Sequence, residues 1–231
     1  MTTARYAIYW APHAGSALAR LGEAWLGRSA EGAVVGARPV VAGFGAAMLD
    51  ATTAEPRRYG LHATLKPPFR LAPGRHAEGL AEAMVDLARR LAPVSPPPLR
   101  LKRMERFLAL VPSGASLALT SLAARCVAHF DDYRAPPDAD EIARRERAGL
   151  TAAQQENLRR WGYPYVMAEF RFHVTLTGPL DPETAARLEP ALAALFAPAV
   201  AAPLDIRELA LFREPVPGAP FELVQRAAMV G

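Results

Sequence analysis

Two segments of the chain, 111 residues apart, carry the same sequence pattern, and this repeat constrains the fold more than any other feature. Residues 59–69 read YGLHATLKPPF and residues 170–180 read FRFHVTLTGPL. Each copy precedes a stretch with helical periodicity and then a pair of β-forming segments that opens with Pro-Leu. Because a stacked array needs about three repeats to bury a continuous core, two copies predict two similar lobes that face each other across a cleft.

Periodicity and capping signals predict a mixed α+β chain. Segments rich in β-formers indicate strands, apolar residues three and four apart indicate amphipathic helices, and Ser16, Asp138 and Thr151 stand where helix N-caps are expected. The Gly-rich stretch 27–45 is expected to be irregular. The expected strands cover 5–10, 59–65, 99–111, 165–177 and 204–227, and the expected helices cover 16–26, 76–91, 115–130, 139–148, 152–160 and 182–196.

The length of 231 residues allows either one large domain or two small lobes. The repeat favours a single functional unit over residues 1–231. Its lobe-forming halves are expected at roughly 1–130 and 166–231, with a helical insertion at 131–165, and neither half is expected to carry a complete site.

Each repeat predicts a strand with one apolar face and one polar face. Side chains alternate across a strand, so residues two apart share a face. In both copies the polar face carries an imidazole, a hydroxyl and a cation. These sets are His62, Thr64 and Lys66 in the first copy, and His173, Thr175 and Arg171 in the second.

That set of side chains suits phosphoester chemistry. Two imidazoles with an ordinary pKa of about 6.5 can act near neutral pH as a general base on water and a general acid on the leaving oxygen. Each hydroxyl can donate to a non-bridging phosphate oxygen, and the cations can offset charge in the transition state. The mechanism needs no metal or other cofactor, and the sequence contains no His-Glu-x-x-His pattern to hold one.

Composition places the chain among ordinary globular proteins. The formal charge is +4, and 25 of the 27 cationic side chains are arginine, which is compatible with an anionic substrate. No block of five or six like charges indicates a nucleic-acid arm. The single cysteine, Cys126, lies in an apolar run and is expected to be a buried, inert thiol. No signal-peptide core and no run of 18 apolar residues is present, so we expect a cytoplasmic protein with no membrane contact.

Duplicated His-x-Thr strands in a two-lobed chain resemble the 2H (two-histidine) phosphoesterase superfamily, which includes bacterial 2′-5′ RNA ligase-like proteins and cyclic nucleotide phosphodiesterases. The resemblance implies that His62 and His173 are the catalytic pair and that Thr64 and Thr175 bind the phosphate. It also implies two pseudo-symmetric lobes, each a small antiparallel sheet backed by helices, around a central cleft.

A narrower resemblance lies in the second copy. The run RFHVTLTG at 171–178, preceded by WGYPY at 161–165 and by the helical segment 143–151, looks like the branch encoded in bacterial phosphonate-utilisation operons. That branch implies hydrolysis of a small cyclic phosphodiester, with a ribosyl cyclic phosphate of phosphonate catabolism as the candidate substrate.

Two other functions remain open on the sequence alone. An RNA 2′,3′-cyclic phosphodiesterase or 2′-5′ RNA ligase-like enzyme would use aromatic side chains for base stacking, and Tyr163 and Tyr165 in the insertion are candidates for contact with either kind of substrate. A non-catalytic phosphometabolite-binding protein would not need two matched imidazoles. The sequence does not determine which histidine is the base and which is the acid.

Overall fold

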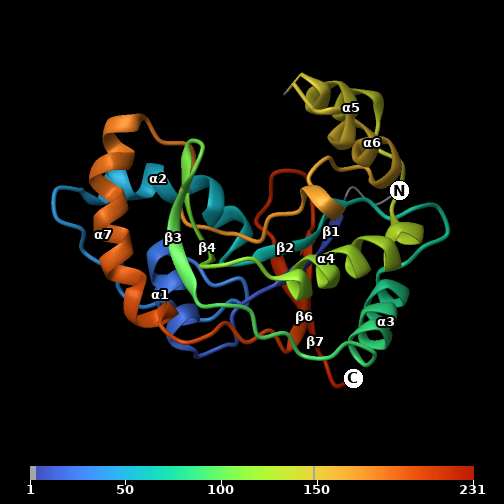
Figure 1. Cartoon of the computed structure of the whole chain (residues 1–231), viewed down its shortest axis with the longest axis horizontal. Coiled ribbons are helices and arrows are strands. Elements are labelled where there is room, and N and C mark those ends of the chain that lie inside the picture. The colour runs from blue at the N-terminus through green and yellow to red at the C-terminus, as the bar shows by residue number, and fades with distance from the viewer. Residues whose placement is uncertain (1–3, 148) are drawn as a thin grey trace.

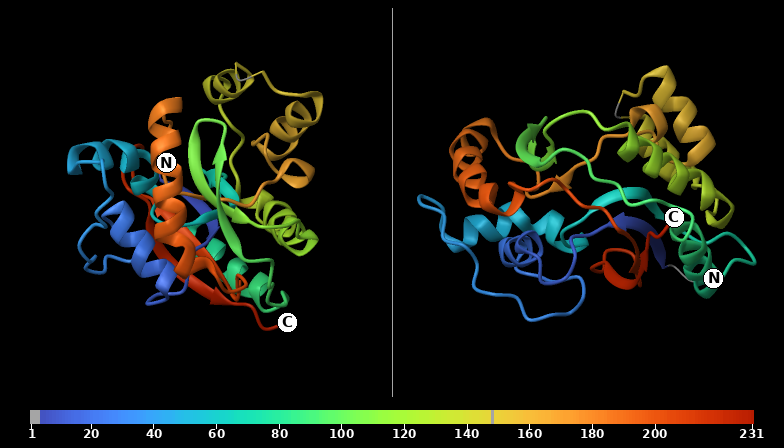
Figure 2. Two further views of the ribbon diagram at one scale, coloured as in Figure 1. Left: turned by 60° about the vertical axis from the view of Figure 1, so that its left-hand side comes forward. Right: turned by 60° about the horizontal axis from the view of Figure 1, so that its bottom comes forward.

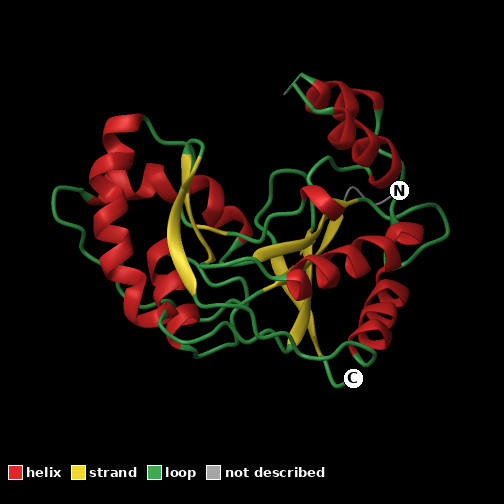
Figure 3. Ribbon diagram, in the orientation of Figure 1, coloured by secondary structure: helices red, strands yellow, loops and turns green. Residues whose placement is uncertain are grey.

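The computed structural model describes residues 4–147 and 149–231, and its helices surround a central sheet (Figures 1 and 3). The sheet has seven strands in the order β3-β4-β5-β2-β1-β6-β7. Neighbouring strands are antiparallel throughout. The predicted α+β class is therefore confirmed, with the strands of both repeats joined in a single sheet. The strands are β1 (Arg5–Trp10), β2 (Ala63–Phe69), β3 (Leu99–Met104), β4 (Phe107–Pro112), β5 (Val174–Thr175), β6 (Glu208–Glu214) and β7 (Glu222–Ala228).

The helices begin largely where the sequence predicts them. Ser16, Asp138 and Thr151 are N-caps, and Thr151 forms a reciprocal capping box with Gln154. Among the described residues, no helix combines the length and apolar character needed to cross a bilayer. The helices are α1 (Ala17–Leu26), α2 (Ala46–Tyr59), α3 (Ala77–Ala88), α4 (Leu117–His129), α5 (Ala139–Glu146), α6 (Ala152–Trp161) and α7 (Pro182–Val200), with 3-10 turns η1 (Asp131–Tyr133) and η2 (Met167–Glu169).

The main differences from the predictions are one additional helix and the extents of the two motif strands. Helix α2 was not predicted, because its buried positions are Leu49, Thr52, Thr53 and Pro56 rather than an apolar stripe. It continues through Tyr59, so the first motif strand starts at residue 63 and not at 59. The second motif strand, expected over 165–177, is only two residues long, and the 3-10 turn η2 occupies part of the expected range. Residue 148, the end of one predicted helix, lies outside the described residues.

The main hydrophobic core lies on one face of the sheet. Side chains of β1, β2, β4 and β5 pack there against helices α1, α3, α4 and α7. Helix α7 runs along the β3–β4 hairpin, as Figure 2 shows. Cys126 lies in this core as predicted, and burial raises the pKa of its thiol to about 12. A smaller apolar cluster on the other face surrounds Tyr9 and Phe212.

The two repeats exchange their hairpins. The hairpin that follows the first motif, β3–β4, pairs with β5 of the second motif. The hairpin that follows the second motif, β6–β7, pairs with β1, which in turn pairs with β2 of the first motif. The motif strands β2 and β5 consequently lie side by side in the middle of the sheet.

Candidate active site

The pairing of β2 with β5 brings the two His-x-Thr motifs together. Ala63 is opposite Val174 in an antiparallel register. Extending this register by one residue in each direction places His62 opposite Thr175 and Thr64 opposite His173. Directly opposed residues share a face and have Cβ atoms about 4.5–5.5 Å apart. The two imidazoles and the two hydroxyls therefore form one group on the face of the sheet opposite the main hydrophobic core.

Both imidazoles are held in the same way. The Nδ1 atom of His62 lies 3.0 Å from the Gly60 carbonyl oxygen, and that of His173 lies 2.7 Å from the Arg171 carbonyl oxygen. A carbonyl oxygen only accepts, so each Nδ1 carries its hydrogen and each Nε2 is left for chemistry. The hydroxyl of Thr64 is 3.3 Å from Nε2 of His62, which places one phosphate-binding candidate beside one acid–base candidate.

The two imidazoles differ in their surroundings. His62 stacks on Tyr9 with ring centroids 3.9 Å apart, and Tyr59 and Phe212 lie within 6.5 Å. His173 contacts the ring of Phe107 at 5.9 Å. Burial lowers the pKa of His62 to about 4, and the positive charge of His173 contributes in the same direction. Burial also lowers the pKa of His173.

Helix α2 positions the first imidazole. The helix ends at Gly60, whose φ of 78° and ψ of 176° are accessible essentially to glycine alone. A Cβ atom at this position would lie 2.9 Å from the Cβ of Ala30. This tight turn aims the Gly60 carbonyl at Nδ1 of His62, so the end of α2 sets both the position and the tautomer of the ring.

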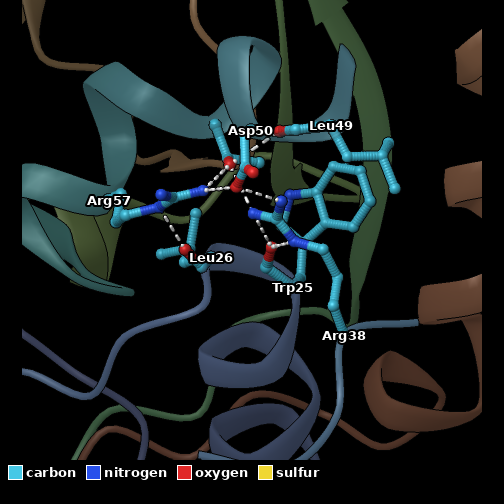
Figure 4. A network of polar contacts seen from close by, with 7 residues as sticks. Trp25, Leu26, Arg38, Leu49, Asp50 and Arg57 are labelled. Carbon is cyan, nitrogen blue, oxygen red and sulfur yellow. Dashed lines mark hydrogen bonds and ion pairs between the residues drawn. The ribbon is translucent and has the colours of Figure 1, made fainter. Parts of the chain in front are cut away.

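An arginine network fixes α2 against α1 (Figure 4). The guanidinium groups of Arg38 and Arg57 both contact the Asp50 carboxylate, at 2.7 and 2.6 Å. Arg38 also donates to the carbonyl oxygen of Trp25, and Arg57 donates to that of Leu26. These bonds satisfy carbonyl groups that the C-terminal turn of α1 leaves unpaired.

Trp25 links the same helix to the second motif. Its indole Nε1 donates to the carbonyl oxygen of Leu176 at 2.8 Å, directly after Thr175. Helix α1 is therefore linked to both motifs. The arginine network joins it to α2, which ends just before His62, and Trp25 joins it to Leu176, which follows Thr175.

A buried carboxylate that the sequence analysis missed lies near the aromatic cluster. The Glu214 side chain is fully buried and accepts hydrogen bonds from Arg5, Arg58 and the Gly218 amide. Burial opposes its ionisation, but the two arginines and the amide hold its pKa below the usual value. Arg58 also lies over the ring of Tyr59, 5.4 Å from its centroid, which connects this ion group to the surroundings of His62.

The position of Lys66 differs from the prediction. It was expected on the same face as Thr64, but a bulge in β2 intervenes, since Tyr9 is opposite Thr64 while the adjacent Ile8 is opposite Lys66. Lys66 therefore turns to the core face, where its Nζ donates to the Val127 carbonyl oxygen at 2.9 Å and contacts Asp131 at 3.3 Å. Burial lowers its pKa to about 8.

Of the other predicted binding residues, Arg171 precedes the second His-x-Thr pair, and Tyr163 and Tyr165 lie between α6 and η2. Arg171 is exposed, and its carbonyl oxygen holds His173. Tyr163 stacks under the Arg145 guanidinium at 4.6 Å and meets the edge of Tyr165 at 5.8 Å. Burial raises the pKa of Tyr9, and Tyr59 and Tyr163 contribute in the same direction. Whether these side chains contact a substrate stays a prediction.

Two other features are separate from the motif residues. A cavity of about 590 Å³ lies between the start of α1 and the end of α7, over Trp10 and Leu204, and no motif residue lines it. Within residues 4–147 and 149–231, no three His, Cys, Asp or Glu side chains converge as metal ligands would.

The fold and the site define a class of α+β proteins with two His-x-Thr segments on adjacent strands of one antiparallel sheet. The chain belongs to the family described as "Protein of unknown function (DUF1045)", whose model matches residues 64–222.

Two curated relatives are named "Ribose 1,5-bisphosphate phosphokinase PhnN". The protein from Janthinobacterium sp. (strain Marseille) is 40% identical over 231 residues, covering 98% of this chain and 51% of the relative. The protein from Laribacter hongkongensis (strain HLHK9) is 38% identical over 221 residues, covering 95% and 50%. The chain thus spans about half the length of these relatives.

Two solved structures are similar to this chain at a lower sequence identity than the curated relatives. "Crystal structure of phosphoesterase" has a TM-score of 0.42 and 13% identity, with 98% of this chain and 99% of that chain covered. The conserved protein of unknown function ATU0111 from Agrobacterium tumefaciens str. C58 has a TM-score of 0.43 and 13% identity, with 99% and 87% covered.

Proposed function

We propose that the protein is a phosphoesterase of the 2H type that hydrolyses a small cyclic phosphodiester by paired-histidine acid–base catalysis. The observation that carries the proposal is the juxtaposition of the two His-x-Thr motifs, with each Nδ1 bonded to a carbonyl oxygen and each Nε2 left for chemistry. A phosphate placed between the motifs would be within reach of two proton-transfer groups and two hydroxyl donors.

The difference in surroundings suggests the roles of the two histidines. With a pKa of about 4, His62 is neutral at pH 7 and its Nε2 can take a proton from water. The negative charge of a bound phosphodiester favours the imidazolium form of His173. The water oxygen then forms a bond to phosphorus, the ring P–O bond breaks, and the leaving oxygen takes the proton from Nε2 of His173.

The two threonines would bind the reacting phosphate. Their hydroxyls can donate to the non-bridging oxygens, which gain negative charge as water attacks. The Arg171 guanidinium would offset negative charge on the same oxygens. Lys66 would not take part, because its Nζ donates to the Val127 carbonyl oxygen on the other face of the sheet.

The names of the curated relatives support a ribosyl substrate. Those proteins are named for a kinase that acts on a ribose phosphate, and this chain matches about half of their length. Together with the resemblance to the phosphonate-operon branch, this favours a ribosyl cyclic phosphate in phosphonate catabolism over RNA.

Product analysis by phosphorus NMR tests the proposal. The protein is incubated with ribosyl cyclic phosphates, nucleoside cyclic phosphates and a short RNA that ends in a 2′,3′-cyclic phosphate. We expect conversion of the small cyclic diesters to phosphomonoesters, with the rate unchanged by a chelator.

Three results would count against parts of this proposal. Binding of the diesters without conversion would support the non-catalytic binder. Preferential conversion of the RNA would support the RNA enzyme. Loss of activity on chelation, restored by a divalent ion, would contradict the metal-independent mechanism.

A further inference from the structure

We infer that the Tyr9 hydroxyl is a further hydrogen-bond donor to the reacting phosphate, next to Thr64 and on the His62 side of the site. The inference rests on the proposed function and assigns it one more residue that contacts the substrate. Tyr9 belongs to β1, which pairs with β2 on the side away from β5. It therefore approaches the first motif from the side that the second motif does not occupy.

The strand register places Tyr9 on the same face as the motif residues. Tyr9 is directly opposite Thr64. Residues directly opposite in an antiparallel pair share a face and have Cβ atoms about 4.5–5.5 Å apart. The adjacent Ile8 and Trp10 pack in the main core, whereas Tyr9 packs in the smaller cluster on the other face. Its side chain thus starts beside one of the two phosphate-binding candidates.

The packing of the Tyr9 ring fixes where its hydroxyl lies. The ring stacks on the imidazole of His62, with centroids 3.9 Å apart and an angle of 29° between the planes. The rings of Phe212 and Phe221 lie 5.0 and 6.2 Å from it on other sides. A ring held by three others cannot swing away, so the hydroxyl stays next to the imidazole of His62.

The Tyr9 hydroxyl is unpaired but accessible. Within residues 4–147 and 149–231 it makes no hydrogen bond, although the side chain as a whole is only 1% exposed. It is nevertheless not one of the fully enclosed, unpartnered side-chain atoms of these residues, which are His129 Nε2, Arg145 Nε and Arg226 Nε. The small exposed area of Tyr9 therefore includes its hydroxyl, which a solvent molecule or a ligand can reach.

The phenol is suited to donate to an anion. Burial raises the pKa of Tyr9 well above its usual value, Tyr59 adds to this, and Arg5 opposes it. The hydroxyl consequently keeps its hydrogen at neutral pH. The non-bridging oxygens of a phosphodiester carry negative charge, and a hydrogen bond to a charged acceptor is stronger than one between neutral groups.

The first motif has use for such a donor. Its expected cation, Lys66, is bound in the core. Its hydroxyl, on Thr64, lies 3.3 Å from Nε2 of His62, and a neutral imidazole with hydrogen on Nδ1 accepts there. Tyr9 has no such competing partner among the described residues. The second motif has no counterpart, because its neighbouring ring is the phenylalanine Phe107.

The first test removes only the hydroxyl. Tyr9→Phe keeps the stacked ring, so its melting temperature should stay close to that of the wild type. We expect kcat/KM for a nucleoside 2′,3′-cyclic phosphate to fall about 10–100-fold, as for the loss of a hydrogen bond to a charged group. Tyr6→Phe is the matched control, because it removes a hydroxyl from the core face of the same strand. It should keep the wild-type kcat/KM.

The second test locates the contact on the phosphate. The two phosphorothioate isomers of the cyclic compound each replace one non-bridging oxygen by sulfur, a weak hydrogen-bond acceptor. The loss caused by Tyr9→Phe should be several-fold smaller for one isomer than for the oxygen compound, and the other isomer should show the full loss. The comparison holds even for a less stable variant, because all three compounds meet the same protein.

Several results would overturn the contact. These are an unchanged kcat/KM in Tyr9→Phe, an equal loss in Tyr6→Phe, or the same loss for all three compounds. If the wild type hydrolyses none of them, the proposed function fails first. Calorimetric titration with inorganic phosphate then decides the contact separately. Tyr9→Phe should raise the Kd about tenfold and Tyr6→Phe should not, whereas equal Kd values or no binding to the wild type would overturn it.

Discussion

His62 and His173 make the same hydrogen bond in different surroundings. Each Nδ1 is bonded to the carbonyl oxygen two residues earlier, as expected of two copies of one motif. Aromatic rings pack around His62, whereas His173 has the ring of Phe107 as its one aromatic neighbour among the described residues and is two residues from the exposed Arg171. Two copies of one sequence pattern therefore give imidazoles that are alike in tautomer and unlike in ease of protonation.

The lowered pKa of His62 predicts acid-dependent stability. The imidazole titrates near 6.5 in the unfolded chain and near 4 in the folded protein, so the unfolded chain binds the proton more readily between these values. The stabilisation is complete above pH 6.5 and is lost as the pH falls toward 4. Melting temperatures measured from pH 8 to 4 should fall less steeply on the acid side for His62→Gln than for the wild type.

The control for this measurement is the exposed His13. His13→Gln should follow the wild-type curve at every pH. Parallel curves for His62→Gln and the wild type would show that burial does not lower the pKa of His62. The proposal that neutral His62 takes the proton from water would then lose its support.

At the scale of elements, the end of α2 and the bulge in β2 determine which side chains reach the site. Neither feature has a clear sequence signal, because α2 buries two threonines and a proline, and a bulge depends on pairing with β1. The His-x-Thr pairs, the helix caps and the hairpins follow from local patterns and were predicted. The Glu214 ion group depends on residues more than 150 positions apart, so only the folded chain reveals it.

Replacing Gly60 tests the role of the α2 terminus. Gly60→Ala adds a Cβ in a backbone conformation reserved for glycine and 2.9 Å from Ala30, so we expect a loss of at least about 1–3 kcal/mol of stability. Because the Gly60 carbonyl holds His62, kcat/KM for the cyclic diester should also fall at temperatures where the variant is folded.

Gly32→Ala is the matched control for that variant. Gly32 also has a positive φ, of 74°, but an added Cβ would have no neighbour within 4 Å. This variant should lose some stability and keep its activity. Equal activity losses in the two variants would indicate that the hydrogen bond to His62 is unimportant.

At the scale of the whole molecule, the exchange of hairpins makes the two repeats mutually dependent. The β3–β4 hairpin of the first repeat pairs with β5 of the second repeat. The β6–β7 hairpin of the second repeat pairs with β1, which belongs to the first half of the chain. A sequence repeat predicts two similar lobes but does not predict which hairpin joins which strand, since that pairing is long-range. The site between β2 and β5 exists only when both repeats are folded together.

Separate halves of the chain should therefore not fold. Fragments 1–130 and 131–231 each leave a hairpin with an unpaired edge and a motif strand without its neighbour. We expect neither fragment alone to show near-ultraviolet circular dichroism or a cooperative thermal transition. A cooperative transition in either fragment would contradict mutual dependence.

The most direct test of the paired-histidine mechanism is kcat/KM for cyclic-diester hydrolysis by His62→Ala, His173→Ala and the double variant, with His13→Ala as control. Removing either proton-transfer group should lower kcat/KM by about 10²–10⁴-fold. The double variant should be little worse than the single variants, because the two groups act as a unit. Wild-type activity in both single variants, with the fold intact by circular dichroism, would contradict the account.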